Sequence, residues 1–336
     1  MKYLVTGGVG FIGSHLCEYL LDRGHQVHVI DNLSTGRLEN VEHLHDHPRF
    51  RLTVDSILNP FAMEPLIQDA DMVFHLAAAV GVKLVIEQPV ATMETNLMGT
   101  EVVLKLAAKH GKKVLVTSTS EVYGKNSKLP FEEDDDCTYG PSTTGRWCYA
   151  YSKALDEFMA FAYLQERRLP VVIARLFNTV GPRQTGRYGM VIPRFIRQAL
   201  DNKPITVYGS GRQSRSFTWV GDVVQALFDL SESDTAVGQV FNVGNDERVA
   251  IEDLAQKVKL MTGSASRIVY IPYEQAYNRN YEDMEHRLPS LRKINRIIGY
   301  RPTMDLERIL RQIIEHMRRD AGAAKAAGSD SLLLSR

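Results

Sequence analysis

The chain has 336 residues, enough for one large α/β unit and a smaller lobe. Hydrophobic residues make up 44% of it and charged residues 24%, which is typical of a soluble globular protein. Lysine plus arginine and aspartate plus glutamate each total 40, so the formal net charge is zero. This balance excludes a global basic field that would hold nucleic acid or an anionic membrane, and any anionic ligand must be bound by local groups.

Apolar strands alternate with amphipathic helices through the first half of the chain. The strands are predicted over residues 2–6, 25–31, 71–77, 112–118 and 169–178. The helices are predicted to follow the glycine-rich turn up to about residue 23, and to span about 90–110 and 147–167. This alternation predicts a Rossmann-type, doubly wound parallel sheet with helices on both faces.

The composition changes after Asn178. Glycine, proline and arginine become frequent in residues 181–189 and 208–215, as in loops that surround a ligand. Further helices are predicted near residues 251–262 and 304–319. We expect a Rossmann domain over residues 1–178, to which residues 214–236 return. A smaller mixed α/β lobe is expected mainly over residues 179–320. Residues 321–336 are expected to form a low-complexity, disordered tail.

The three cysteines, Cys17, Cys137 and Cys148, have neither disulfide-framework nor metal-site spacing. We expect a cytoplasmic protein, because the N-terminus also lacks the apolar stretch of a secretion signal. A membrane span is not expected, since no apolar run reaches roughly 18 residues. The five consecutive carboxylates at 132–136 are expected to form a solvated loop, and no metal site is predicted.

Gly7, Gly10 and Gly13 form G-x-x-G-x-x-G directly after the first predicted strand. Such glycines let the backbone turn tightly and approach a pyrophosphate, which the N-terminus of the next helix then faces. Asp31 ends the second strand, near the offset of about 20 residues for an acid that binds a ribose 2′-hydroxyl. Because this carboxylate would repel a 2′-phosphate, we expect NAD rather than NADP.

Tyr149 and Lys153 are spaced as Y-x-x-x-K, which places both on one face of a helix. An ammonium beside the phenol is expected to lower the tyrosine pKa, so that Tyr149 can remove a hydroxyl proton while hydride leaves the same carbon for NAD⁺. The segment TSTSEVYG (117–124) ends another predicted strand. Its side chains should therefore meet Tyr149 at the same edge of the sheet.

These and neighbouring segments together resemble the extended short-chain dehydrogenase/reductase family of NAD-dependent nucleotide-sugar epimerases and dehydratases. The segments are TGGVGFIGSHL, DN at 31–32, HLAA, TSTSEVYG, YAYSK and RLFNTVGPRQ, and the resemblance covers about residues 1–320. It implies a nucleotide-sugar substrate, with UDP-sugars favoured, and a homodimer formed through helices near 90–110 and 147–167. The competing class is a non-enzymatic NAD sensor, against which the intact set of Thr119, Tyr149 and Lys153 argues.

The resemblance implies three sets of site residues. The NAD-binding set is Gly7, Gly10, Phe11, Ile12, Gly13, Asp31, Asn32, Asp55, Leu76, Ala77, Ala78, Tyr149 and Lys153. The catalytic set is Thr119, Glu121, Tyr149, Lys153 and Arg287. The substrate-binding set is Ser120, Arg146, Asn178, Val191, Arg194, Val207, Tyr208, Arg215 and Arg287, with residues 191–194 expected in a loop.

The resemblance also implies that the sugar is first oxidised at C4, after which the possible reactions diverge. Glu121 favours decarboxylation or dehydration, because simple 4-epimerases usually carry a small or apolar residue there. The segments RWCY (146–149) and YEDMEHRLPS (281–290) are similar to a UDP-glucuronate decarboxylase. Arg146 can bind a C6 carboxylate in a bidentate manner, whereas Arg287 is either catalytic or, as in epimerases, paired with a phosphate.

Three reactions therefore remain open. The first expectation is UDP-glucuronate decarboxylation, with UDP-xylose or a 4-keto-pentose as product. The main alternative is a UDP-sugar 4-epimerase acting on the glucose/galactose or the glucuronate/galacturonate pair, and a 4,6-dehydratase comes third.

Overall fold

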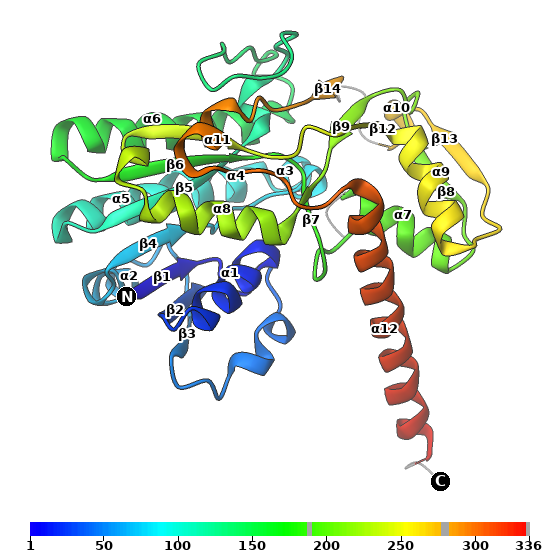
Figure 1. Cartoon of the computed structure of the whole chain (residues 1–336), viewed down its shortest axis with the longest axis horizontal. Coiled ribbons are helices and arrows are strands. Elements are labelled where there is room, and N and C mark those ends of the chain that lie inside the picture. Colours follow the sequence, from blue (N-terminus) through cyan, green and yellow to red (C-terminus); the bar gives the residue numbers. More distant parts are fainter. Residues whose placement is uncertain (187–189, 277–281, 334–336) are drawn as a thin grey trace.

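The computed structural model describes residues 1–186, 190–276 and 282–333. Its largest sheet has seven strands, all parallel (Figure 1). In spatial order they are β11 (Gln239–Val243), β6 (Val171–Leu176), β5 (Lys113–Thr119), β4 (Met72–His75), β1 (Lys2–Thr6), β2 (Gln26–Asp31) and β3 (Phe50–Val54). This order confirms the predicted Rossmann-type sheet. Its edge strand β11 comes from the second half of the chain, directly after residues 214–236.

Helices cover both faces of this sheet. One face packs against α1 (Phe11–Asp22), α8 (Val220–Glu232) and α11 (Arg292–Ile298), and the other against α2 (Pro60–Asp69), α5 (Gly99–His110) and α6 (Trp147–Arg167). Successive residues of β1 therefore enter different cores: Tyr3 and Val5 pack on the α1 side, and Leu4 packs on the opposite side. Burial on both faces explains why these strands are continuous apolar runs in the sequence.

The second lobe has a core of its own. Three helices, α7 (Val191–Leu200), α9 (Ile251–Thr262) and α12 (Leu306–Leu333), pack there with the parallel strands β8 (Ile205–Tyr208) and β13 (Ile268–Ile271). The remaining short elements are α3 (Val82–Glu87), α4 (Pro89–Met93), β7 (Thr179–Val180), β9 (Ser214–Ser216), β10 (Thr218–Trp219), β12 (Arg248–Ala250), α10 (Tyr273–Ala276) and β14 (His286–Arg287), a π-helical turn (Glu94–Met98), and 3₁₀ turns at Leu38–Asn40, Glu42–Leu44, Ser120–Tyr123 and Asp234–Ala236.

Two local expectations differ from the structure. Residues 191–194, expected in a loop, form the first turn of α7, because Ile192, Phe195 and Ile196 place one apolar face on the core of the second lobe. The acidic run is not uniformly solvated, since Glu133 is buried and its carboxylate accepts a hydrogen bond from the backbone N–H of Asn242 at 2.8 Å. A buried acceptor needs such a donor, which lies more than a hundred residues away in the chain.

The C-terminal helix α12 projects away from the body of the molecule (Figure 1). It continues through residues 321–333, which the composition predicts to be a loose tail, and the alanines in this segment have high helix propensity. Residues 334–336 of that tail, 187–189 of the glycine-rich stretch and Tyr281 lie outside the described residues. Among the helices that the structure describes, none is both long and apolar enough to cross a membrane.

The carboxyl ends of the parallel strands meet at one edge of the main sheet. The strand order reverses between β1 and β4, and this is the place where open α/β sheets leave a crevice for ligands. The glycine-rich turn after β1 and the segment after β5 both open onto this edge. The fold therefore brings the predicted motifs together although they are far apart in the sequence.

Candidate active site

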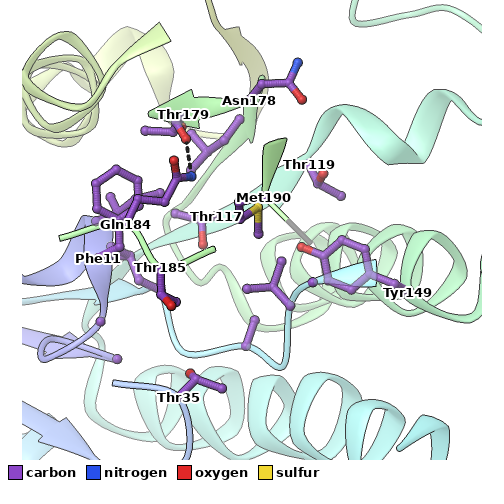
Figure 2. Close-up of a pocket in the computed structure, with 18 of the residues that line it drawn as sticks. Phe11, Thr35, Thr117, Thr119, Tyr149, Asn178, Thr179, Gln184, Thr185 and Met190 are labelled. Carbon is purple, nitrogen blue, oxygen red and sulfur yellow. Dashed lines mark hydrogen bonds between the residues drawn. The ribbon is translucent and has the colours of Figure 1, made fainter. Parts of the chain in front are cut away.

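A cavity of about 450 Å³ lies along this edge, with walls from both lobes. Figure 2 shows Thr119 at the end of β5 and Tyr149 on α6 reaching into it. Of the predicted site residues, all but Val207 line the cavity. The side chain of Val207 is fully buried in the core of the second lobe, whereas its neighbour Tyr208 faces the cavity, as the alternation of a β-strand requires.

The glycine-rich turn has no room for side chains. Gly7 has a φ of +73°, and a Cβ at this residue would lie 2.9 Å from the Cα of Ala77. A Cβ at Gly13 would lie 2.2 Å from the carbonyl oxygen of Gly7. No side chain caps the N-terminus of α1, so its first amides are free to face a phosphate. The turn therefore fits a dinucleotide pyrophosphate.

Two carboxylates line the cavity where β2 and β3 end. Asp31 is buried and accepts hydrogen bonds from the backbone N–H of Leu33 at 2.9 Å and of Val9 at 3.2 Å. Burial raises the pKa of Asp31, and the two backbone donors oppose that rise. Asp55 is oriented by the backbone N–H of Ser56 at 2.6 Å and by the amide of Asn59 at 3.1 Å. Both acids are held in place to accept hydrogen bonds from sugar hydroxyls or a base.

Tyr149 is buried beside the end of β5. Burial raises the pKa of its phenol above the ordinary value, and the negative charges of Glu121 and Asp156 raise it further. The hydroxyl of Thr119 and the charge of Arg287 act in the opposite direction. The expected lowering of the pKa by the ammonium of Lys153 is therefore wrong for this structure, because burial is the largest effect and Lys153 is paired with Asp156 at 2.7 Å.

Glu121 joins two arginines in the part of the cavity beside Tyr149. Its Oε1 accepts a hydrogen bond from Nη1 of Arg287 at 3.3 Å, and its Oε2 lies 3.9 Å from Nη2 of Arg146. The three side chains are at most 14% exposed. The structure thus brings together the three residues on which the sequence alternatives depend.

Asp283 completes this group, although the sequence does not single it out. Its carboxylate accepts hydrogen bonds from Arg146 at 3.3 Å, from Arg215 at 2.9 Å and from the hydroxyl of Tyr273 at 3.0 Å. Burial would raise the pKa of Asp283, but Arg215 and the other arginines hold it below the ordinary value. The one available signal is its position inside the segment 281–290, four residues before Arg287.

We call Glu121, Arg146, Arg215, Asp283 and Arg287 the arginine cluster. Its three guanidinium groups and two carboxylates leave one formal positive charge. Burial and the nearby Arg215 lower the pKa of Arg287 to about 10, so that it is still a cation at neutral pH. Nε of Arg287 is buried, with no hydrogen-bond partner among the described residues. The cluster is therefore suited to one additional anionic group with acceptor oxygens.

The rest of the substrate side comes from the second lobe. Arg194 donates a hydrogen bond to Thr206 at 2.8 Å, and its guanidinium carbon lies 3.9 Å from the centre of the Tyr208 ring. Asn178 is oriented by a hydrogen bond from its side-chain amide to the carbonyl of Ser216 at 2.9 Å. Lining residues without a predicted role include Thr35, Arg37, Arg183, Gln184, Thr185 and Met190.

A Rossmann sheet with a glycine-rich turn, a Y-x-x-x-K helix and a second lobe over the sheet edge defines an extended short-chain dehydrogenase. The chain belongs to the family described as GDP-mannose 4,6 dehydratase, whose model matches residues 4–313. This match confirms the resemblance predicted from the sequence motifs and assigns the chain to a family of nucleotide-sugar-modifying enzymes.

Two relatives are named as decarboxylases. The chain is 41% identical to a UDP-N-acetyl-alpha-D-glucosaminuronate decarboxylase from Bacillus cytotoxicus, an alignment that covers 94% of this chain and 98% of the relative. It is 38% identical to UDP-glucuronic acid decarboxylase 1 from Danio rerio, over 95% of this chain and 73% of the relative.

Solved structures of 4-epimerases have the same fold. UDP-glucuronic acid 4-epimerase from Bacillus cereus, in complex with UDP-glucuronic acid and NAD, superposes with a TM-score of 0.85 and 30% identity over 95% of this chain and 99% of that one. UDP-glucose 4-epimerase from Thermotoga maritima superposes with a TM-score of 0.86 and 29% identity, over 96% and 100% of the two chains.

Proposed function

We propose that this protein is an NAD-dependent decarboxylase of UDP-glucuronate or a 2-acetamido relative, acting through transient oxidation at C4. The observation that carries the proposal is the arginine cluster, because its residual positive charge lies at the sugar end of the cavity beside Tyr149. A neutral sugar would leave that charge buried without an acceptor, which is costly. A C6 carboxylate provides both the compensating charge and the hydrogen-bond acceptors. The decarboxylase names of the relatives support the same assignment.

NAD is proposed because the glycine-rich turn fits a pyrophosphate and Asp31 would repel a 2′-phosphate. When bound, NAD⁺ accepts a hydride from C4 of the sugar and can later return it. Gly7, Gly10 and Gly13 give the diphosphate access to the amides of α1, while Asp31 accepts hydrogen bonds from the adenosine ribose. Crystal complexes of related enzymes with NAD support this cofactor.

The chain's own residues then perform the proton transfers. Tyr149 removes the proton of the C4 hydroxyl as the C4–H bond breaks, and Thr119 holds the phenol in position by a hydrogen bond. The resulting 4-keto sugar has its ketone β to the C6 carboxylate. The C5–C6 bond can then break, with carbon dioxide leaving and the electron pair delocalised into a C4 enolate.

Arg146 and Arg287 orient the carboxylate before this bond breaks. We assign to Glu121, which contacts both arginines, the transfer of a proton from water to C5 of the enolate. If C4 is reduced again, with Tyr149 returning its proton to the C4 oxygen, the product is UDP-xylose or its 2-acetamido relative, and release before that reduction gives a UDP-4-keto-pentose. The diphosphate is assigned to Arg194, which lines the cavity from the second lobe outside the arginine cluster.

A 4-epimerase is the second candidate. The structural similarity to an epimerase that binds UDP-glucuronic acid and NAD favours it, because the same cavity would then only turn the keto sugar over. In that reaction Arg287 would pair with a phosphate and Glu121 would take no part in chemistry.

One incubation distinguishes the two reactions. Purified protein is mixed with UDP-glucuronate, or UDP-N-acetylglucosaminuronate, and NAD⁺, while carbon dioxide release and the nucleotide-sugar products are followed. A UDP-pentose with stoichiometric gas release supports decarboxylation, whereas UDP-galacturonate without gas supports epimerisation. Tyr149→Phe serves as the inactive control. Conversion of UDP-glucose or UDP-N-acetylglucosamine alone, with both uronates unchanged, contradicts both proposals.

We further propose a homodimer. Six apolar side chains are at least 41% exposed on α4, the π-helical turn and α6, which pack beside one another: Val90, Met93, Met98, Tyr151, Leu155 and Phe158. A second copy would bury this face as one contact. Light scattering should give twice the chain mass, and Phe158→Glu, at 73% exposed, should give the monomer. A monomeric wild type contradicts this proposal.

We also propose a cytoplasmic location, supported by three free cysteines.

A further inference from the structure

A buried ion pair lies on α6 beside the reacting tyrosine. Nζ of Lys153 lies 2.7 Å from Oδ2 of Asp156, three residues further along the helix, and the two side chains are 3% and 0% exposed. Lys153 belongs to the predicted catalytic set, whereas Asp156 has no part in that set or in the proposed C4 oxidation. An aspartate removed completely from water is costly unless a cation compensates it. The pairing thus ties the charge of Lys153 to a second group.

The other ionisable groups near this pair are occupied elsewhere. His75 on β4 is held between Thr6 at 2.8 Å and Thr100 at 3.0 Å, and burial, together with the charge of Lys153, lowers its pKa to about 3. It is therefore neutral near pH 7. Glu157 is bound by Arg175 on β6 at 2.7 Å. Asp156 is consequently the carboxylate that balances Lys153.

Charged groups from several elements also face Tyr149. Glu121 from the 3₁₀ turn after β5 and Asp156 from α6 disfavour the phenolate, whereas Arg287 from β14 favours it. Glu121 and Arg287 are bonded to each other at 3.3 Å, so their opposite effects partly cancel. Lys153 and Asp156 form a second such pair. The charge balance within this second pair is therefore a determinant of where the phenol of Tyr149 titrates.

We propose that Asp156 is a positioning residue, which holds the ammonium of Lys153 in place on α6 and compensates its charge. An uncompensated ammonium would stabilise the phenolate more strongly and bring the base form to lower pH. With Asp156 present, the same ammonium is held in place while its field at the phenol is reduced. Lys153 also lines the cavity, so it keeps contact with the ligand side.

This inference rests on the proposed role of Tyr149, and its test does not need the proposed product. The phenol of Tyr149 is titrated by NMR in protein labelled with ¹³C at the tyrosine ζ carbon, with Tyr149→Phe identifying the signal. Asp156→Asn removes the negative charge at nearly constant size. Its Tyr149 midpoint should fall by about one pH unit relative to the wild type. Glu166→Gln, an exposed charge on the same helix, is the matched control and should leave the midpoint unchanged.

The pH profile of turnover gives a second measurement. The acidic limb of kcat should move to lower pH in Asp156→Asn by the same amount as the NMR midpoint and should stay in place in Glu166→Gln. An unchanged or higher Tyr149 midpoint in folded Asp156→Asn overturns the inference. If that variant does not fold, Asp156→Ser is measured in its place, and an unchanged or higher Tyr149 midpoint in that variant overturns the inference in the same way. Absence of decarboxylation with the predicted NMR shift would refute the proposed reaction alone.

Discussion

The contact between Glu121 and Arg287 allows a sharp test of the proposed chemistry. The perturbation is a double-mutant cycle of Arg287→Met, Glu121→Gln and the combined variant. Nη1 of Arg287 and Oε1 of Glu121 are 3.3 Å apart, and their side chains are 12% and 14% exposed. If both act in the same decarboxylation step, Arg287 on the leaving carboxylate and Glu121 on C5, losing either should remove most of what the pair contributes.

The magnitude follows from this geometry. Two unit charges 3.3 Å apart attract by about 5 kcal/mol at an effective dielectric constant of about 20, and desolvation of the buried ions offsets much of that. Residues in direct contact typically couple by about 1–3 kcal/mol. Each single variant should lose roughly 10²–10³-fold in kcat, or about 3–4 kcal/mol of transition-state stabilisation. The double variant should be about 5- to 150-fold more active than the product of the two losses predicts.

The assay is carbon dioxide release from UDP-glucuronate under saturating substrate, with thermal unfolding measured on every variant. The unfolding data are needed because removing one partner of a buried pair also destabilises the fold. Additive losses, or a loss in Arg287→Met that falls on KM while kcat is kept, would refute the reasoning. Such a result would favour the epimerase-like alternative, in which Arg287 pairs with a phosphate and not with a C6 carboxylate.

Three further outcomes are expected. Tyr149→Phe should abolish turnover while NAD stays bound, and activity within about tenfold of wild type, or roughly 1.4 kcal/mol, would show that another group transfers the proton. Gly13→Ala should abolish NAD binding in calorimetry, because its Cβ would meet the carbonyl of Gly7 at 2.2 Å; retained affinity would contradict the tight packing of this turn. Burial raises the pKa of Asp31, so the carboxylate takes up a proton at a higher pH than an ordinary aspartate and loses an acceptor for the ribose. In the wild type, NAD affinity should therefore begin to fall, as the solution is acidified, at a pH above the usual aspartate range. In Asp31→Asn the affinity should not change over the same pH range.

Much of the fold and of the cofactor half of the site could be predicted from the sequence. The strand-helix alternation, the three glycines and Asp31 are local patterns, and a parallel sheet brings every strand end to one edge whatever the packing details. Tyr149 and Lys153 share a helix face by their spacing alone. These predictions depend on backbone geometry, which short stretches of sequence largely determine.

The substrate half depends on packing between distant segments. Asp283 meets Arg146 and Arg215 only because β14 lies beside β9, across from the start of α6. Val207 and Tyr208 are neighbours in the chain, yet the burial of one strand face decides which of them reaches the cavity. No local pattern contains that information.

By itself, the sequence determined the class of fold, the glycine-rich turn after the first strand and the tyrosine–lysine pair. Only the tertiary structure decided the electrostatics of the site, namely the net charge of the arginine cluster and the direction in which the pKa of Tyr149 moves. The physical reason is that a charge acts according to its burial and its nearest partners, and both are set by contacts such as Asp156 with Lys153 and Glu121 with Arg287.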